Sequence, residues 1–191
     1  MHVWVCDQVD VRPLGKFNDN YNYILSVINV FSKFLYLVSL RSKKVTAVAS
    51  AFISIFEDSS RRRRPVQLRT DKGKEFLNKP FQAMLNCEGI QFQVCGNPYV
   101  KQSVNERVHR TIRDRLYKYF THKNIYRYID VLPKFVSAYN DTIHSATGMA
   151  KSRVTESDVL AIWKTMEFRR RGFRVAKANF RVGTLVRIRK E

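Results

Sequence analysis

The chain has 191 residues, of which 45% are hydrophobic and 13% aromatic, enough for a domain of about 150 residues with a real core. Thirty-five Lys and Arg against sixteen Asp and Glu give a formal net charge of +19, which favours nucleic acid as the partner ahead of an anionic membrane surface. No apolar run of about 18 residues and no signal peptide are recognisable, so we expect a soluble, intracellular protein.

The first predicted strand, residues 3–11, carries an acid on an apolar face. Strand alternation places Val5, Asp7 and Val9 on one face and Cys6 and Asp10 on the other. A carboxylate on an apolar face is costly unless it is neutralised, paired or bound to a cation. We therefore take Asp7 as a candidate site residue, and we expect Asp10 to be exposed or hydrogen-bonded.

The next elements extend this strand into a sheet. Residues 23–31 and 34–40 are rich in β-formers and predict two antiparallel strands with a turn at Ser32 and Lys33. Residues 45–56 have helical apolar spacing, and four arginines at 61–64 follow them. Such a run is first a solvated loop, with a DNA contact or a nuclear-import signal as the alternative.

A second acid follows the next predicted strand, residues 66–70. Asp71 comes at its carboxyl end and Gly73 follows, which is where α/β sheets place ligands and chemistry. Asn78 then predicts the start of a helix and Gly89 its end, before a last strand at 90–94. This order predicts a mixed α/β sheet with helices packed on it.

A third acid lies on a long amphipathic helix predicted for residues 103–120. Its apolar stripe consists of Val104, Val108, Ile112, Leu116 and Tyr119. Within about 60° of one another on the far side lie Glu106, Arg110, Arg113 and Tyr117. Glu106 can be a simple helical ion-pair partner of Arg110 or a member of a site with Asp7 and Asp71.

The last part of the chain changes in composition. Another amphipathic helix is predicted from Leu132 to Tyr139, ending within residues 140–144. From Glu156 onward basic residues dominate, and only residues 180–188 have the pattern of a strand. We therefore predict a core at 1–155 and, at 156–191, a basic linker with the first strand of an incomplete module.

The chemistry of the three acids favours hard cations. If two strand acids and one helix acid converge at one edge of the sheet, they can bind two Mg²⁺ or Mn²⁺ ions about 3.5–4 Å apart that act on a phosphodiester. The three cysteines form no C-x-x-C pair, and neither they nor the four histidines supply the four clustered ligands that structural zinc requires.

Three motifs carry a family resemblance. Residues 4–7 read W-V-C-D, residues 70–76 read T-D-K-G-K-E-F, and residues 104–111 read V-N-E-R-V-H-R-T. Together they resemble the W-x-x-D, T-D-x-G-x-x-F and V-x-E-R-x-x-R-T motifs of retroviral-type integrase catalytic cores. Asp71 and Glu106 have 34 residues between them, close to the family spacing. The resemblance covers residues 3–155 and implies a ribonuclease-H-like mixed five-stranded sheet flanked by helices.

Further stretches narrow the resemblance. Residues 101–104, 117–121, 126–130 and 139–150 are most similar to integrases of self-synthesising DNA transposons of the Maverick or Polinton kind. Residues 180–188 resemble the opening strand of the SH3-like C-terminal domain of such enzymes. Lys151 stands where many members have proline, and neither a His-His-Cys-Cys zinc module nor the full SH3-like module is recognisable.

The resemblance also implies roles. Asp7, Asp71 and Glu106 would be the catalytic metal ligands of a DNA strand transferase, acting with two Mg²⁺ or Mn²⁺ ions. The residues implied to contact DNA are Lys101, Gln102, Arg107, Arg110 and Arg113. The expected partners are element ends and target DNA, the expected assembly is a homo-oligomer, and the expected location is the nucleus.

Two other functions fit the same sequence. One is a nuclease of the same fold that cuts without joining. The other is a non-catalytic basic DNA-binding protein, a decayed or host-adopted integrase, in which the acids only pair with arginines.

Overall fold

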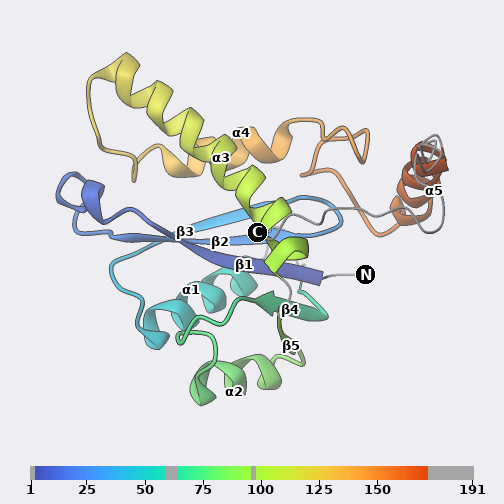
Figure 1. The fold of residues 1–191 in the computed structure, drawn as a ribbon, viewed down its shortest axis with the longest axis horizontal. Helices are drawn as coiled ribbons and strands as arrows, with labels where there is room; N and C mark the ends of the chain where they lie inside the picture. Colours follow the sequence, from blue (N-terminus) through green and yellow to red (C-terminus); the bar gives the residue numbers. More distant parts are fainter. Residues whose placement is uncertain (1–2, 59–63, 96–97, 172–191) are drawn as a thin grey trace, which may run out of the picture. The chain divides into compact units, whose positions relative to one another are not determined.

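The computed structural model describes residues 3–58, 64–95 and 98–171, with backbone alone for 98–104 and 169–171 (Figure 1). The chain divides into two compact units, residues 1–154 and residues 155–191. Each is described by itself. No helix within the described ranges is both long enough and apolar enough to cross a membrane.

The first unit is built on a five-stranded mixed sheet. Its strands are β1 (Val3–Asp10), β2 (Tyr23–Asn29), β3 (Leu35–Leu40), β4 (Gln67–Thr70) and β5 (Gln91–Val94). The strand order is β3-β2-β1-β4-β5, with β1 antiparallel to β2 and parallel to β4. The pair β2–β3 is antiparallel and the pair β4–β5 is parallel. The predicted mixed five-stranded sheet is confirmed.

One face of the sheet is covered by α1 (Val45–Glu57) and α2 (Lys79–Cys87), below the sheet in Figure 1. Trp4 and Cys6 of β1 point into this core, where Phe52 of α1 packs edge-on against Phe81 of α2. Gly89 follows α2 with φ +69°, the left-handed conformation that ends a helix. Both helices and the Gly89 terminus agree with the sequence prediction.

The other face is covered by α3 (Pro98–Lys123) and α4 (Leu132–Asp141), above the sheet in Figure 1. Val108, Ile112 and Leu116 of the predicted apolar stripe are buried here. The predicted boundaries of α3, 103–120, are too short: the helix begins at Pro98, because proline fits the first helical position, where no intrahelical N–H bond is needed.

The C-terminal segment is helical where it is described. Helix α5 spans Val159–Arg171 in the second unit, within the segment predicted as a basic linker. The predicted strand at 180–188 and its SH3-like assignment lie outside the described residues. Of the arginine run, Arg64 is described: it is exposed and forms an ion pair with Glu88.

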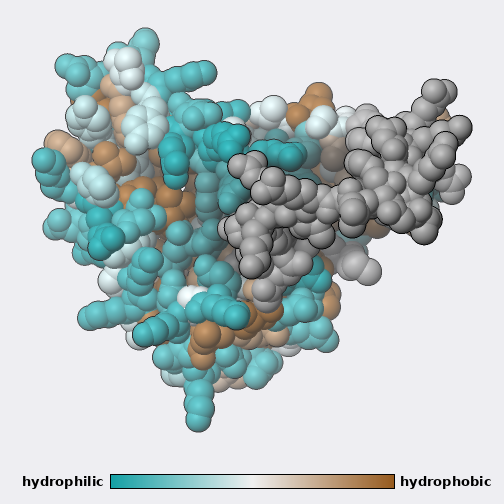
Figure 2. Space-filling view, viewed as in Figure 1, coloured by the Kyte–Doolittle hydropathy of each residue, from teal (hydrophilic) through white to brown (hydrophobic). Residues whose placement is uncertain are grey.

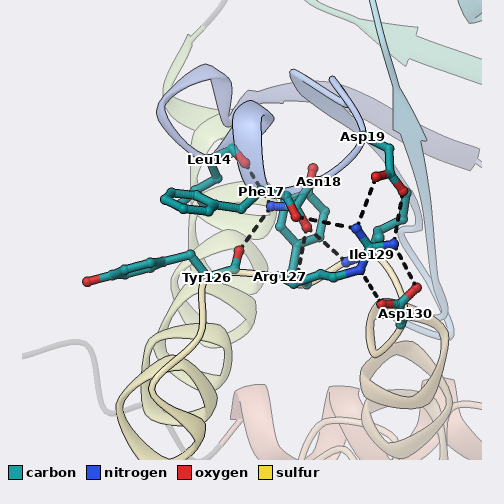
Figure 3. Close-up of polar contacts among 9 residues, drawn as sticks. Leu14, Phe17, Asn18, Asp19, Tyr126, Arg127, Ile129 and Asp130 are labelled. Carbon is teal, nitrogen blue, oxygen red and sulfur yellow. Dashed lines mark hydrogen bonds and ion pairs between the residues drawn. The ribbon is translucent and has the colours of Figure 1, made fainter.

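A buried asparagine joins two loops on the α3 side of the molecule (Figure 3). Asn18 follows the short 3-10 helix η1 (Arg12–Phe17) and is fully buried. Its Nδ2 donates to the carbonyl oxygens of Leu14 (2.8 Å) and Tyr126 (3.0 Å), and its Oδ1 accepts from the backbone N–H groups of Tyr128 (2.7 Å) and Ile129 (3.2 Å). These four bonds hold the α3–α4 connection against η1.

Exposed ion pairs surround this junction. The guanidinium of Arg127 lies between Asp19 and Asp130, with N–O distances of 2.9 and 2.5 Å (Figure 3). Hydrogen bonds from Arg127 hold the pKa of the Asp19 carboxyl below its usual range. Because all three groups are exposed, we assign the stability of the junction to Asn18 rather than to these pairs.

The C-terminal end of α4 is fixed by two polar side chains. Asn140 bonds both the backbone N–H and the carbonyl oxygen of Leu35 at 2.9 Å, and so pairs the outer edge of β3. Lys151 is buried, and its Nζ donates to the carbonyl oxygens of Tyr139 and Thr142 at 2.9 and 3.0 Å. Lys151 thus serves as a cap for the last carbonyl groups of α4.

Candidate functional site

Asp7 lies in the middle of the sheet, on the face that α3 covers. It is half-buried, and its Oδ1 accepts the backbone N–H of Gln8 at 2.8 Å. Val9, two residues further along the same face, packs into the core formed with α3. Asp10 points away, as predicted: it is exposed and bonded to Arg12, and these hydrogen bonds lower the pKa of Asp10.

Asp71 lies at the same edge of the sheet as Asp7. Strands β1 and β4 are parallel, with Val5 paired to Arg69. The ladder ends there, two residues before Asp7 on β1 and two residues before Asp71, which directly follows β4. Both acids therefore lie beyond the carboxyl end of the β1–β4 pair.

The turn after β4 involves Asp71, Gly73 and Phe76, each in a different way. Asp71 Oδ1 accepts the backbone N–H of Gly73 at 3.1 Å, which holds the carboxylate in place. A Cβ atom on Gly73 would lie 2.9 Å from the Glu75 carboxyl carbon, so a larger residue at this position would require the flexible Glu75 side chain to move. Phe76 is fully buried against Phe81 and anchors the turn to the core.

Glu106 lies on α3, which packs on β1. Its side chain is exposed, as are those of Arg110, Arg113 and Tyr117, the other members of the predicted polar face. Arg107 is also exposed but is turned by about 100° around the helix from Glu106. The predicted DNA contacts therefore divide: Arg110 and Arg113 share the face of Glu106, whereas Arg107 lies on another flank of α3.

His109 of α3 was not predicted as a site residue. Burial lowers the pKa of His109, whereas the negative charges of Asp7 and Glu106 raise it. The imidazole is therefore close enough to both carboxylates to interact with them electrostatically. Its Nε2 is buried without a partner among the described residues, as is Oγ of Ser26, which pairs with Asp7 across β1 and β2. The sequence feature that could have indicated His109 is its position three residues after Glu106, on the side of α3 that faces the sheet.

The sequence also matches a known protein family. The integrase core domain family matches residues 1–98, half of the chain. The chain belongs to the integrase core domain family. A transposon-derived protein of Caenorhabditis elegans is 30% identical over 173 residues, which cover 91% of the chain. The chain spans 57% of the length of that relative.

Solved structures place the integrase core in the same fold. The magnesium complex of the HTLV-2 integrase catalytic core domain matches 80% of the chain and 95% of that domain with a TM-score of 0.65 and 19% identity. The catalytic core domain of BIV integrase matches 85% of the chain and 98% of that domain with a TM-score of 0.65 and 18% identity. A subunit of a simian T-cell lymphotropic virus intasome matches 81% of the chain, and 55% of its own length, with a TM-score of 0.69 and 16% identity.

The three predicted site acids have the chemistry, though not the clustered arrangement, of a site for a hard divalent cation. Asp7, Asp71 and Glu106 offer carboxylate oxygens, which Mg²⁺ and Mn²⁺ prefer over imidazole or thiolate ligands. Backbone N–H groups hold the Asp7 and Asp71 carboxylates, and buried polar atoms of Ser26 and His109 surround Asp7. Within the described residues, no three acid, His or Cys side chains are arranged closely enough to hold one ion.

The remaining predicted DNA contacts are only partly described. Lys101 and Gln102 lie in the first turns of α3, but their side chains fall outside the described set. Hydrophilic side chains predominate on the face of the integrase core shown in Figure 2, in keeping with the net charge of +19. The described part of the site therefore combines a carboxylate pair at a sheet edge with an exposed basic helix face.

The depressed pKa of His109 predicts acid sensitivity. In metal-free buffer, the free energy of unfolding should fall as the pH is lowered from about 7.5 to about 5.5, because the unfolded chain then binds more protons than the folded one. His109→Asn should flatten this dependence relative to the wild-type protein, and His122→Asn, at an exposed position, should not. Urea denaturation at several pH values measures both. An unchanged slope in His109→Asn would show that protonating His109 costs the folded protein nothing.

Proposed function

We propose that this protein is the catalytic core of a DNA integrase, which hydrolyses a phosphodiester at the ends of a mobile element and joins the new 3′-hydroxyl to target DNA. The observation that supports this proposal is the β1–β4 pairing, after which Asp7 and Asp71 each follow by two residues, while α3, the helix that bears Glu106, packs on β1. The charges of both Asp7 and Glu106 raise the pKa of His109 against the effect of burial, which supports including Glu106 in the proposed site.

The proposed cofactor is a pair of Mg²⁺ or Mn²⁺ ions. Asp7 would bind both ions, with Asp71 completing one coordination sphere and Glu106 the other. When bound, the ions supply charge stabilisation for the attacking and the leaving oxygen. The chain itself holds the Asp7 and Asp71 carboxylates through hydrogen bonds from the Gln8 and Gly73 N–H groups. Strand β2 and helix α3 provide the buried residues beside Asp7.

The proposed substrate is DNA held by the basic face of α3. Arg110 and Arg113 are exposed beside Glu106, where they can contact phosphates on either side of the bond to be cut. Lys101 and Gln102, in the first turns of the same helix, extend this proposed contact. A charge of +19 provides the general attraction that any such contact requires.

The origin and assembly of the protein belong to the same proposal. The similarity of residues 101–104, 117–121, 126–130 and 139–150 to Maverick or Polinton integrases, with the transposon-derived relative, supports a self-synthesising DNA transposon as the source. Joining two element ends in concert requires a homo-oligomer and access to nuclear DNA. Residues 1–155 would form the core, and residues 156–191 the linker and the start of an SH3-like module.

An oligonucleotide assay tests the proposed activity directly. The full chain, incubated with Mn²⁺ and an end-labelled duplex, should produce shortened strands and, from them, joined products longer than the substrate. Shortened strands without joined products would favour a nuclease of the same fold. DNA binding without any product would favour the non-catalytic DNA-binding alternative.

Removing one phosphate contact should change the salt dependence of DNA binding. We expect Arg110→Gln to weaken binding equally for unrelated sequences and to reduce the slope of log affinity against log salt by about one, since phosphate contacts carry no base information. Lys79→Gln, on α2 across the sheet, removes the same charge and should leave the slope almost unchanged. Equal slopes in Arg110→Gln and Lys79→Gln would remove Arg110 from the DNA-binding surface.

A further inference from the structure

A second polar pocket lies on the flank of α3 that Arg107 occupies. It has a volume of about 370 Å³ and is lined by Lys33, Arg107, Val108, Thr111, Tyr139, His144, Ala146 and Lys151. These residues come from the β2–β3 turn, α3, the end of α4 and the loop that follows α4. Arg107 and Thr111 are turned by about 100° and about 140° around α3 from Glu106, so the pocket is separate from the carboxylate edge.

The pocket has a strong excess of positive charge. No acid lines it, and none of the described acids forms an ion pair with Lys33, Arg107 or Lys151. Burial, followed by the charges of Lys151, Lys33 and Arg107, lowers the pKa of His144. Burial, followed by the charge of Arg107, lowers the pKa of Lys33. All three cations therefore act on His144, and Arg107 also acts on Lys33, so an anion in the pocket that they line would relieve this repulsion.

The fold holds Lys33 in this pocket at a conformational cost. Its φ is +61°, a left-handed conformation that glycine or asparagine adopts more easily, and its side chain is half-buried. The Nζ atom donates to the carbonyl oxygen of Val30 at 2.5 Å, which uses one of its three N–H bonds. The ammonium group is thus positioned by the turn and still has donors to offer.

The other polar groups are arranged as donors as well. His144 Nδ1 accepts the backbone N–H of Ala146 at 3.1 Å, so the neutral ring carries its proton on Nε2. Arg107 is exposed, with its planar fork available for oxygen atoms. Lys151 is committed to the end of α4 and contributes charge rather than a contact. An anion with several oxygen atoms would match this set.

We propose that this pocket is a binding site for a phosphoryl group, separate from the carboxylate edge and independent of catalysis there. Arg107, Lys33 and His144 would donate to its oxygens, and Lys151 would add charge from behind. The group would belong either to a DNA backbone or to a free oligophosphate, because both present the same oxygens. Arg107 then has a role different from that of Arg110 and Arg113, although all three belong to one helix.

Histidine signals of the full chain report on the pocket. Inorganic pyrophosphate is titrated into protein labelled at histidine, in about 0.3 M salt so that diffuse attraction is screened. We expect the NMR signal of His144, assigned from His144→Gln, to shift saturably while that of exposed His122 stays in place. Arg107→Gln and Lys33→Gln should each weaken this binding at least about tenfold, and Lys79→Gln should not.

A competition experiment with DNA identifies the source of the phosphoryl group. A duplex that displaces pyrophosphate from His144 would identify backbone phosphate as the occupant, and a duplex that binds without displacing it would identify a free oligophosphate. The proposal is overturned if the His144 signal does not saturate, or if Arg107→Gln and Lys79→Gln respond alike; since Arg107 is exposed, its variant remains informative even if Lys33→Gln misfolds. Asp71→Asn should keep the site, so loss of catalysis and loss of the pocket are distinguishable.

Discussion

Asp71→Asn should abolish Mn²⁺-dependent cutting and joining of a labelled duplex, with a loss of at least about a thousandfold in rate. Asparagine has nearly the same shape as aspartate, and its carbonyl oxygen can still accept the Gly73 N–H that bonds Asp71 Oδ1 at 3.1 Å. It lacks the negative charge that a divalent cation requires from its ligand. The turn should therefore stay folded while the proposed metal site is lost, and gel analysis of the products measures the difference.

The matched control is Asp114→Asn. Asp114 is an exposed acid on α3, and its substitution changes the net charge by the same amount. This variant should cut and join like the wild-type protein, whereas Asp71→Asn should bind DNA as well as before or better, because one repulsive charge is gone. If Asp71→Asn were as active as Asp114→Asn, the proposed catalytic role of Asp7 and Asp71 would be contradicted. DNA binding would then be the only part of the proposed function left.

The sheet and the position of its acids could be predicted because local patterns determine them. Alternation in residues 3–11 placed Asp7 on the face that α3 covers, and a strand of four residues placed Asp71 at a carboxyl end. Once β1 and β4 pair in parallel, both acids follow the paired residues at the same end of the two strands. The amphipathic stripe of α3 could also be predicted from the sequence, since Val108, Ile112 and Leu116 recur with helical spacing.

Long-range polar contacts could not be predicted from such local sequence patterns. Asn140 pairs with Leu35 across 105 positions of sequence, and Asn18 bonds Tyr126, Tyr128 and Ile129 across 108 to 111. Isolated asparagines give no periodic signal, because their function depends on which backbone groups the finished fold leaves beside them. The division of the α3 basic residues between two flanks also required the folded positions of Lys33 and the loop after α4.

Asn18→Ala should be among the most destabilising substitutions in the protein. It removes four hydrogen bonds at a fully buried position and leaves two N–H groups and two carbonyl oxygens of η1 and the α3–α4 connection without this partner. Unsatisfied buried groups cost about 1–3 kcal/mol each, and because three of these four bonds are only partly buried, water can recover part of that cost, so we expect a loss of roughly 3–5 kcal/mol in unfolding free energy. Thermal denaturation should show a melting temperature lower by roughly 10 °C.

Two further variants separate hydrogen bonding from simple loss of volume. Asn18→Asp keeps the acceptor for Tyr128 and Ile129 but turns a negative charge toward the carbonyl oxygens of Leu14 and Tyr126, so it should also be unstable near neutral pH. Acidification should restore part of its stability relative to Asn18→Ala, because a protonated carboxyl can again donate. Asn86→Ala, at an exposed position of α2, should change the unfolding free energy by less than about 0.5 kcal/mol. If Asn18→Ala were as stable as Asn86→Ala, the four bonds would contribute nothing, and the exposed ion pairs of Arg127 would have to hold the two loops together.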